Sequence, residues 1–191
     1  MRGVALLVLA SLAAASIPVW AADAAAPGIA NFHQVNARIY RGGQPKGEGW
    51  DSLAKLGVKT VINLRPEGKR SYKREARAVE AAGMHYVDVP LSGVWTPPDA
   101  KIAQVLALLD DAAGPVFVYC RRGSDRTGEV IACYRIQHDG WSNRKALQEA
   151  NSYGLRRINI AMRRYVLGFH AAGHAAGAQP APAPAQPQLS R

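Results

Sequence analysis

The chain of 191 residues has few cysteines, few acidic residues and no internal repeat, and each shortage narrows what it can be. Two cysteines cannot build the disulfide framework of a small secreted scaffold. Only 14 acidic residues stand against 24 lysines and arginines, so the formal net charge is +10 and anionic substrates or surfaces are expected. The sequence contains no recognised nucleic-acid-binding module, which favours a polyanionic substrate over a nucleic acid.

The main apolar run lies at the start of the chain. Met1 and Arg2 precede the run 4–12, and a stretch of small residues leads to Val19-Trp20-Ala21, which is similar to an Ala-x-Ala cleavage site. We therefore predict a signal peptide over residues 1–21 and a periplasmic or secreted protein. An uncleaved membrane anchor is the alternative, but the run is short and rich in alanine. No stable membrane anchor is expected after cleavage.

The remainder divides into three parts by composition. Residues 22–30 are a predicted N-terminal linker, and residues 31–170 have the size and apolar content of one domain with its own core. Residues 171–191 are rich in alanine, proline, glycine and glutamine, and we predict a disordered tail because such a segment cannot bury a core.

Alternating β-rich and helical segments predict an α/β fold, with a mostly parallel central sheet flanked by helices. Gly57 and Gly83 each follow a helical segment and precede a strand, as glycines at a helix C′ position do. Ser142 is a candidate N-cap. The predicted strands are 38–41, 58–64, 85–89 and 116–119, and the predicted helices are 50–56, 71–82, 97–111, 127–139, 142–151 and 155–170.

The segment 116–128 carries the clearest chemical signal. An apolar β-rich run ends at Cys120, a short polar loop follows, and Arg126-Thr127-Gly128 opens a helical pattern. Free amides at a helix N-terminus bind anions and stabilise a thiolate, so we expect Cys120 to be the nucleophile of a phosphate pocket. Arg126 would offer its planar fork to two phosphoryl oxygens. A buried, inert thiol is the alternative for Cys120.

Other residues of this loop have separate expected roles. The hydroxyl of Thr127 can donate to the sulfur of Cys120 and stabilise the thiolate when it leaves. Gly123 suits a close backbone approach. Neither a metal nor another cofactor is expected, because the amides and Arg126 neutralise the phosphoryl charge. The predicted phosphate-binding residues are Arg121, Arg122, Gly123, Ser124, Asp125 and Arg126.

The motif Cys120-x5-Arg126-Thr127-Gly128 resembles the signature loop of the cysteine-dependent protein tyrosine and dual-specificity phosphatases. The likeness to small bacterial members extends over about residues 31–153, including segments 39–45 and 57–65. One position differs from the superfamily's usual pattern: the residue before the cysteine is usually histidine, and here it is Tyr119. The resemblance implies a phosphatase domain that hydrolyses phosphotyrosine or mixed phosphoresidues through a phosphocysteine.

The leaving alcohol or phenol needs a proton, and three aspartates are candidate general acids. Asp125 resembles the loop aspartate of some bacterial and lipid-directed relatives, where it is the suspected acid; a structural hydrogen bond is the alternative. Asp99 lies where relatives carry a mobile acid-bearing loop, but Thr96 and Asp99 also form a capping-box pattern, with Pro97 at the first helical position. Asp88 alternates with valines on a predicted strand, which is typical of a solvated face.

Further arginines leave the substrate class open. The side chains of Arg121 and Arg122 can reach a second anionic group, or they can serve solubility alone. In the first case the substrate is a polyanion such as an inositol phosphate or phosphoinositide. Arg41 and Arg65, at element ends, are further basic candidates. A non-catalytic phosphate-binding module is the hypothesis from another class, and sulfur transfer and arsenate reduction match the motif less well.

Overall fold

The computed structural model describes residues 26–66 and 70–171. The predicted signal peptide and nearly all of the predicted tail lie outside these residues. Within the described residues, no helix has the length and apolar character needed to cross a membrane.

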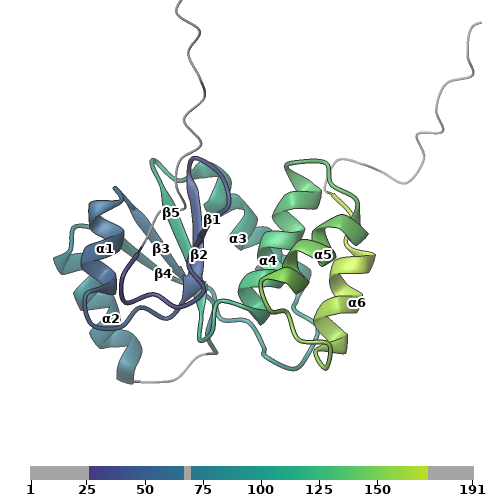
Figure 1. The fold of residues 1–191 in the computed structure, drawn as a ribbon, viewed down its shortest axis with the longest axis horizontal. Coiled ribbons are helices and arrows are strands. Elements are labelled where there is room, and N and C mark those ends of the chain that lie inside the picture. Colours follow the sequence, from purple (N-terminus) through teal and green to yellow (C-terminus); the bar gives the residue numbers. More distant parts are fainter. Residues whose placement is uncertain (1–25, 67–69, 172–191) are drawn as a thin grey trace, which may run out of the picture.

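A five-stranded sheet forms the centre of the molecule, in the order β1-β2-β5-β3-β4 (Figure 1). The short edge strand β1 pairs antiparallel with β2, and every other pair is parallel. This confirms the predicted α/β class and the mostly parallel sheet. The strands are β1 (His33–Gln34), β2 (Ile39–Gly43), β3 (Thr60–Asn63), β4 (His85–Asp88) and β5 (Val116–Cys120).

Helices cover both faces of this sheet. Alternation along β5 sends Phe117 and Tyr119 to one face and Val118 and Cys120 to the other. The first face packs against α1 (Gly49–Lys55) and α2 (Arg70–Ala81), and the second packs against α3 (Asp99–Asp111) and α4 (Asp125–Gln137). Cys120 therefore lies on the α3 and α4 side, at the carboxyl end of the central strand.

Two further helices, α5 (Asn143–Ser152) and α6 (Ile160–Gly168), pack on the outer side of α4 (Figure 1). Arg135 of α4 forms a 2.8 Å ion pair with Glu149 of α5. Helix α4 is thus held between the sheet and the outer pair, and its N-terminus has a fixed place beside the end of β5.

Some element boundaries differ from the prediction. Helix α4 begins at Asp125 and α6 at Ile160, whereas the sequence predicted 127 and 155. The capping box at Thr96 was wrong, because Pro98 occupies the N-cap position of α3 without a side-chain cap bond. The predicted N-cap Ser142 is confirmed, since its hydroxyl accepts the backbone N–H of Lys145 at 3.3 Å.

Candidate active site

The loop between β5 and α4 turns tightly around Gly123. This glycine has a φ of +73°, and a Cβ placed on it would lie 2.4 Å from the carbonyl carbon of Gly42 and 2.5 Å from the nitrogen of Gly43. The parallel register that sets Gly43 opposite Cys120 brings the end of β2 under the loop. Only glycine fits this conformation and this contact, so the loop is shaped by its packing against β2.

Arg41 supports the loop from inside the protein. Its side chain is 1% exposed, and its Nη2 donates to the carbonyl oxygen of Gly123 at 2.8 Å. The guanidinium lies 4.5 Å from the ring centroid of Tyr153, and Asn31 donates to the carbonyl oxygens of Gly123 and Tyr153, each at 3.0 Å. Burial lowers the pKa of Arg41 to about 10, and the nearby Cys120 is among the groups that oppose this shift. A protonated arginine therefore lies beneath the loop at neutral pH.

A cavity of about 130 Å³ opens at the loop and gathers most of the predicted site residues. Cys120, only 3% exposed, lies at the end of the strand, while Gly123 and Ser124 are buried in the turn. The cavity places one thiol among four arginines and one carboxyl group. Its lining residues are Cys120, Arg121, Arg122, Asp125, Arg126 and Arg156.

The side chain of Arg126 is held between two segments of the chain. Its Nη1 donates to the carbonyl oxygen of Leu64 at 3.4 Å, just beyond the end of β3. A Cβ placed on Gly93, in the connection from β4 to α3, would lie 3.4 Å from Nη2 of Arg126. Its Nε is buried and has no partner among the described residues. The guanidinium is thus positioned at the cavity with hydrogen-bonding capacity left over for an anion.

Asp125 is bound to Arg156, a residue that the sequence analysis did not single out. Its Oδ1 accepts the backbone N–H of Arg156 at 3.1 Å, and its Oδ2 lies 2.9 Å from Nη2 of the same residue. Asp125 is buried, whereas the side chain of Arg156 is 50% exposed. Asp125 therefore serves here as an acceptor that fixes an arginine at the cavity. The role of general acid stays a prediction for it.

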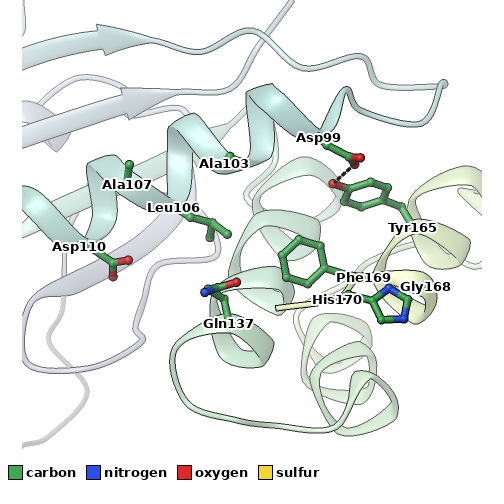
Figure 2. A pocket seen from close by; sticks show the side chains of 10 residues that line it. All are labelled: Asp99, Ala103, Leu106, Ala107, Asp110, Gln137, Tyr165, Gly168, Phe169 and His170. Atoms are coloured by element: carbon green, nitrogen blue, oxygen red, sulfur yellow. Dashed lines mark hydrogen bonds between the residues drawn. The ribbon is translucent and has the colours of Figure 1, made fainter. Parts of the chain in front are cut away.

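The other two candidate acids lie elsewhere. Asp99, at the start of α3, accepts the hydroxyl of Tyr165 at 2.8 Å (Figure 2). Figure 2 shows it at one end of a second, larger cavity of about 490 Å³ between α3, α4 and α6. Asp88 ends β4 and accepts the side-chain amide of Asn63 at 2.7 Å. Neither aspartate lines the cavity of Cys120.

Two buried polar side chains follow Arg126 in the first turns of α4. Thr127 and Glu129 are both 0% exposed, and neither the hydroxyl of Thr127 nor the carboxyl of Glu129 has a hydrogen-bond partner among the described residues. Burial raises the pKa of Glu129 to about 8, and the positive charge of Arg126 partly opposes this. Glu129 is therefore mostly protonated at neutral pH. The hydrogen bond from Thr127 to the thiolate stays a prediction.

Tyr119 stands where histidine is usual and is part of a polar cluster on the opposite face of the sheet. Its hydroxyl donates to Oε2 of Glu75 at 2.8 Å, and Glu75 also forms an ion pair with Arg65. Burial raises the pKa of Tyr119 well above its usual range, so this residue is a neutral donor. The cluster connects the end of β5 to α2.

Sequence reasoning missed Arg156 and Asn31. Arg156 lies in the connection from α5 to α6 and Asn31 precedes β1, so both reach the loop only through the fold. No local spacing pointed to either residue. Asn31 has a φ of +51°, which an asparagine tolerates and which the sequence does not reveal.

Comparisons with known proteins show which family this chain resembles. A family model described as "DSP-PTPase phosphatase fused to NAD+ Kinase" matches residues 14–166. The dual specificity protein phosphatase TpbA of Pseudomonas aeruginosa (strain UCBPP-PA14) is 32% identical over 147 residues, which are 76% of this chain and 63% of TpbA. The chain thus spans less than two thirds of the length of that relative.

Two solved structures share the fold. A crystal structure of P. aeruginosa TpbA in complex with pTyr superimposes with a TM-score of 0.61 at 26% identity, covering 74% of this chain and 90% of that one. The core catalytic domain of the PP-IP phosphatase SIW14 from S. cerevisiae, in complex with citrate, gives a TM-score of 0.65 at 25% identity, covering 73% and 85%. By its loop, its fold and these matches, this chain belongs to the family of cysteine-dependent dual-specificity and tyrosine phosphatases.

Proposed function

We propose that this protein hydrolyses phosphomonoesters, with phosphotyrosine or mixed phosphoresidues as substrates, through a phosphocysteine intermediate. The observation that carries the proposal is the cavity that gathers Cys120 and Arg126 at the N-terminus of α4. Backbone amides and the helix dipole at such a site stabilise both a thiolate and a bound phosphoryl group. The family membership supports the same conclusion.

The reaction takes two steps at phosphorus. The sulfur of Cys120 attacks in line, an S–P bond forms, and the O–P bond to the leaving group breaks. The leaving oxygen takes a proton from a general acid or departs as a phenolate. Water then attacks the phosphocysteine, inorganic phosphate is released, and the thiolate returns. Arg126 and the loop amides hold the equatorial oxygens in both steps.

The residue that protonates the leaving group is proposed to be Asp125, because it is the only predicted acid that lines the cavity of Cys120. Its carboxyl accepts hydrogen bonds from Arg156 in this structure, so acting as the acid requires this contact to change when substrate binds. An Asp125→Asn variant should keep activity toward an aryl phosphate with a good leaving group and lose it toward an alkyl phosphate.

Inositol phosphates or phosphoinositides are the second candidate substrates. Arg121, Arg122 and Arg156 add positive charge at the cavity beyond what Arg126 and the amides supply to one phosphate. SIW14, a PP-IP phosphatase, is among the proteins of similar fold. Parallel assays of a phosphotyrosine peptide and an inositol phosphate separate the two classes by their kcat/KM values.

The experiment that tests the activity compares two cysteine variants. Cys133 is buried in α4, and burial raises the pKa of its thiol well above the usual value, so it is an inert matched control. We expect Cys120→Ser to abolish metal-free hydrolysis of an aryl phosphate by the reduced protein, and Cys133→Ala to retain it. No turnover by the wild type, on aryl phosphate or inositol phosphate, would favour a non-catalytic phosphate-binding module.

We also propose that the protein is exported to the periplasm or the medium. The support is the N-terminal sequence, with its basic start, apolar run 4–12 and small residues before position 22. Fractionation of cells that express the full chain, with N-terminal sequencing of the product, tests this. A product that begins near residue 22 outside the cytoplasm is expected, and an intact N-terminus in the cytoplasm would contradict the proposal.

A further inference from the structure

Exposed bulky apolar side chains are concentrated beside the active site. Five large hydrophobic residues are exposed in the described part of the chain, and four of them belong to two segments. Val94 and Trp95, 71% and 75% exposed, lie in the connection from β4 to α3. Ile158 and Ile160, 77% and 57% exposed, lie at the end of the connection from α5 to α6 and at the start of α6. We call these four residues the apolar rim.

Both segments of the apolar rim adjoin the catalytic cavity. Gly93, next to Val94, packs against the guanidinium of Arg126, and Arg156, two residues before Ile158, lines the cavity. The hydrogen bond between Tyr165 and Asp99 joins α6 to the start of α3, the two helices that follow these segments. Figure 1 shows both connections at the end of the molecule where α4 begins. Each segment of the apolar rim is therefore close in sequence to a residue that lines the cavity or packs against it.

The first segment is held in shape by its own hydrogen bonds. The hydroxyl of Ser92 accepts the backbone N–H groups of Val94 at 3.2 Å and of Trp95 at 3.0 Å. This turn fixes the backbone while both side chains remain in solvent. Exposing a tryptophan and three aliphatic side chains in water is unfavourable, and exposed apolar surface of this kind is a feature of binding sites.

Positive charge surrounds the same mouth. Arg121, Arg122, Arg156 and Arg157 are all exposed, and the one acid of the cavity, Asp125, is already paired with Arg156. Tryptophan with aliphatic and arginine side chains is the combination found where proteins meet the interface of an anionic bilayer. We propose that the apolar rim and these arginines form a docking surface for an anionic lipid bilayer, which sets the mouth of the cavity against the headgroups.

A bilayer fits this arrangement better than a peptide does. The four apolar side chains come from two separate segments, and none of them is among the residues that line the cavity. A bilayer is wide enough to contact both segments at once, whereas the lining of the cavity, one cysteine with arginines and an aspartate, offers a peptide no apolar side chain. The docking surface does not depend on which phosphomonoester the protein hydrolyses.

Tryptophan quenching by brominated lipid tests the proposal on the full chain. Vesicles of phosphatidylcholine, with or without phosphatidylserine, are compared, and the quenched fraction of wild type is set against that of Trp95→Ala. Both proteins keep Trp20, Trp50 and Trp141, so the difference reports the quenching of Trp95 together with the binding that depends on it. We expect quenching of Trp95 on the anionic vesicles. Equal quenching in the two proteins would overturn the proposal.

Vesicle sedimentation supplies the second readout. The double variant Ile158→Ser, Ile160→Ser should bind anionic vesicles on the order of tenfold more weakly than wild type. The matched control is Leu167→Ser, since Leu167 is the fifth exposed large hydrophobic residue of the described part and lies near the end of α6. We expect the control to bind as wild type does. An equal effect of both variants, or none of either, would contradict a specific docking surface.

Soluble substrates separate this proposal from the catalytic one. The apolar-rim variants should hydrolyse a small aryl phosphate at the wild-type rate, which also establishes that they fold. If the variants instead raise KM for a soluble phosphotyrosine peptide and leave vesicle binding unchanged, the apolar rim is a peptide site and the bilayer proposal is wrong. Absence of turnover by the wild type, on aryl phosphate and inositol phosphate alike, would refute the proposed activity and would leave the vesicle result unchanged.

Discussion

Glu129 is expected to make the stability of this protein fall as the pH rises through neutrality. Its carboxyl is fully buried in α4, and neither oxygen has a hydrogen-bond partner among the described residues. Burial raises its pKa from 4.5 to about 8, despite the opposing charge of Arg126. The substitution Glu129→Met keeps the length of the side chain and removes the ionisable group.

The direction follows from proton binding in the two states. Between pH 4.5 and about 8 the native carboxyl keeps a proton that the unfolded chain has lost, so each rise in pH within this window favours unfolding. Below the window both states are protonated, and above it both are ionised, so the penalty is constant there. At ~1.36 kcal/mol per pKa unit, the gap between 4.5 and about 8 is worth about 5 kcal/mol.

The assay is urea unfolding of wild type and Glu129→Met at pH 5 and at pH 8. Other groups titrate over the same range, but wild type and the variant both contain them. The difference between the two free energies of unfolding therefore reports Glu129. We expect the stability advantage of Glu129→Met to grow by a few kcal/mol between the two pH values. Glu80→Met, at an exposed position of α2, is the control and should show no such growth. If Glu129→Met is more stable than wild type by the same amount at pH 5 and pH 8, the carboxyl of Glu129 does not hold a proton in the native state as described.

Three further predictions concern the loop and its cavity. Gly123→Ala should destabilise the protein by roughly 2 kcal/mol or more in urea unfolding, because its φ of +73° and its contact with β2 exclude a Cβ; wild-type stability would contradict this. Arg41→Lys should lower kcat about tenfold with an unchanged circular dichroism spectrum, since lysine cannot both reach the carbonyl of Gly123 and stack on Tyr153. Arg156→Ala should raise KM about tenfold for a substrate with two phosphate groups and less for an aryl phosphate. Equal changes in KM for the two substrates would show that Arg156 does not bind the second phosphate group.

The layers of the fold could be predicted because local patterns specify them. Gly57 and Gly83, both with a φ of +76°, end α1 and α2 at the positions that the sequence indicated. The apolar run before Cys120 gave the central strand β5. The edge strand β1 was missed, because two half-buried residues carry no alternating pattern and form a strand only through pairing with β2.

The site residues within the loop could be predicted from the sequence, but those that reach the loop from other elements could not. Cys120, Arg126 and the turn between them lie within one local segment, so their spacing alone indicated a phosphate pocket. Arg156 reaches the cavity from a distant connection, and its contact with Asp125 exists only once α5 and α6 have packed on α4. Likewise, no sequence pattern indicated that Asp99 would bind Tyr165 instead of lining the cavity.

Detection of the phosphocysteine decides whether Cys120 is the nucleophile. Reduced full-length protein is mixed with an aryl phosphate, quenched in acid during turnover, digested and analysed by mass spectrometry. We expect a phosphoryl group on the peptide that contains Cys120, and none on the peptide that contains Cys133 or in the Cys120→Ser variant. Steady turnover with no phosphate on Cys120, or turnover that survives Cys120→Ser, would contradict this expectation.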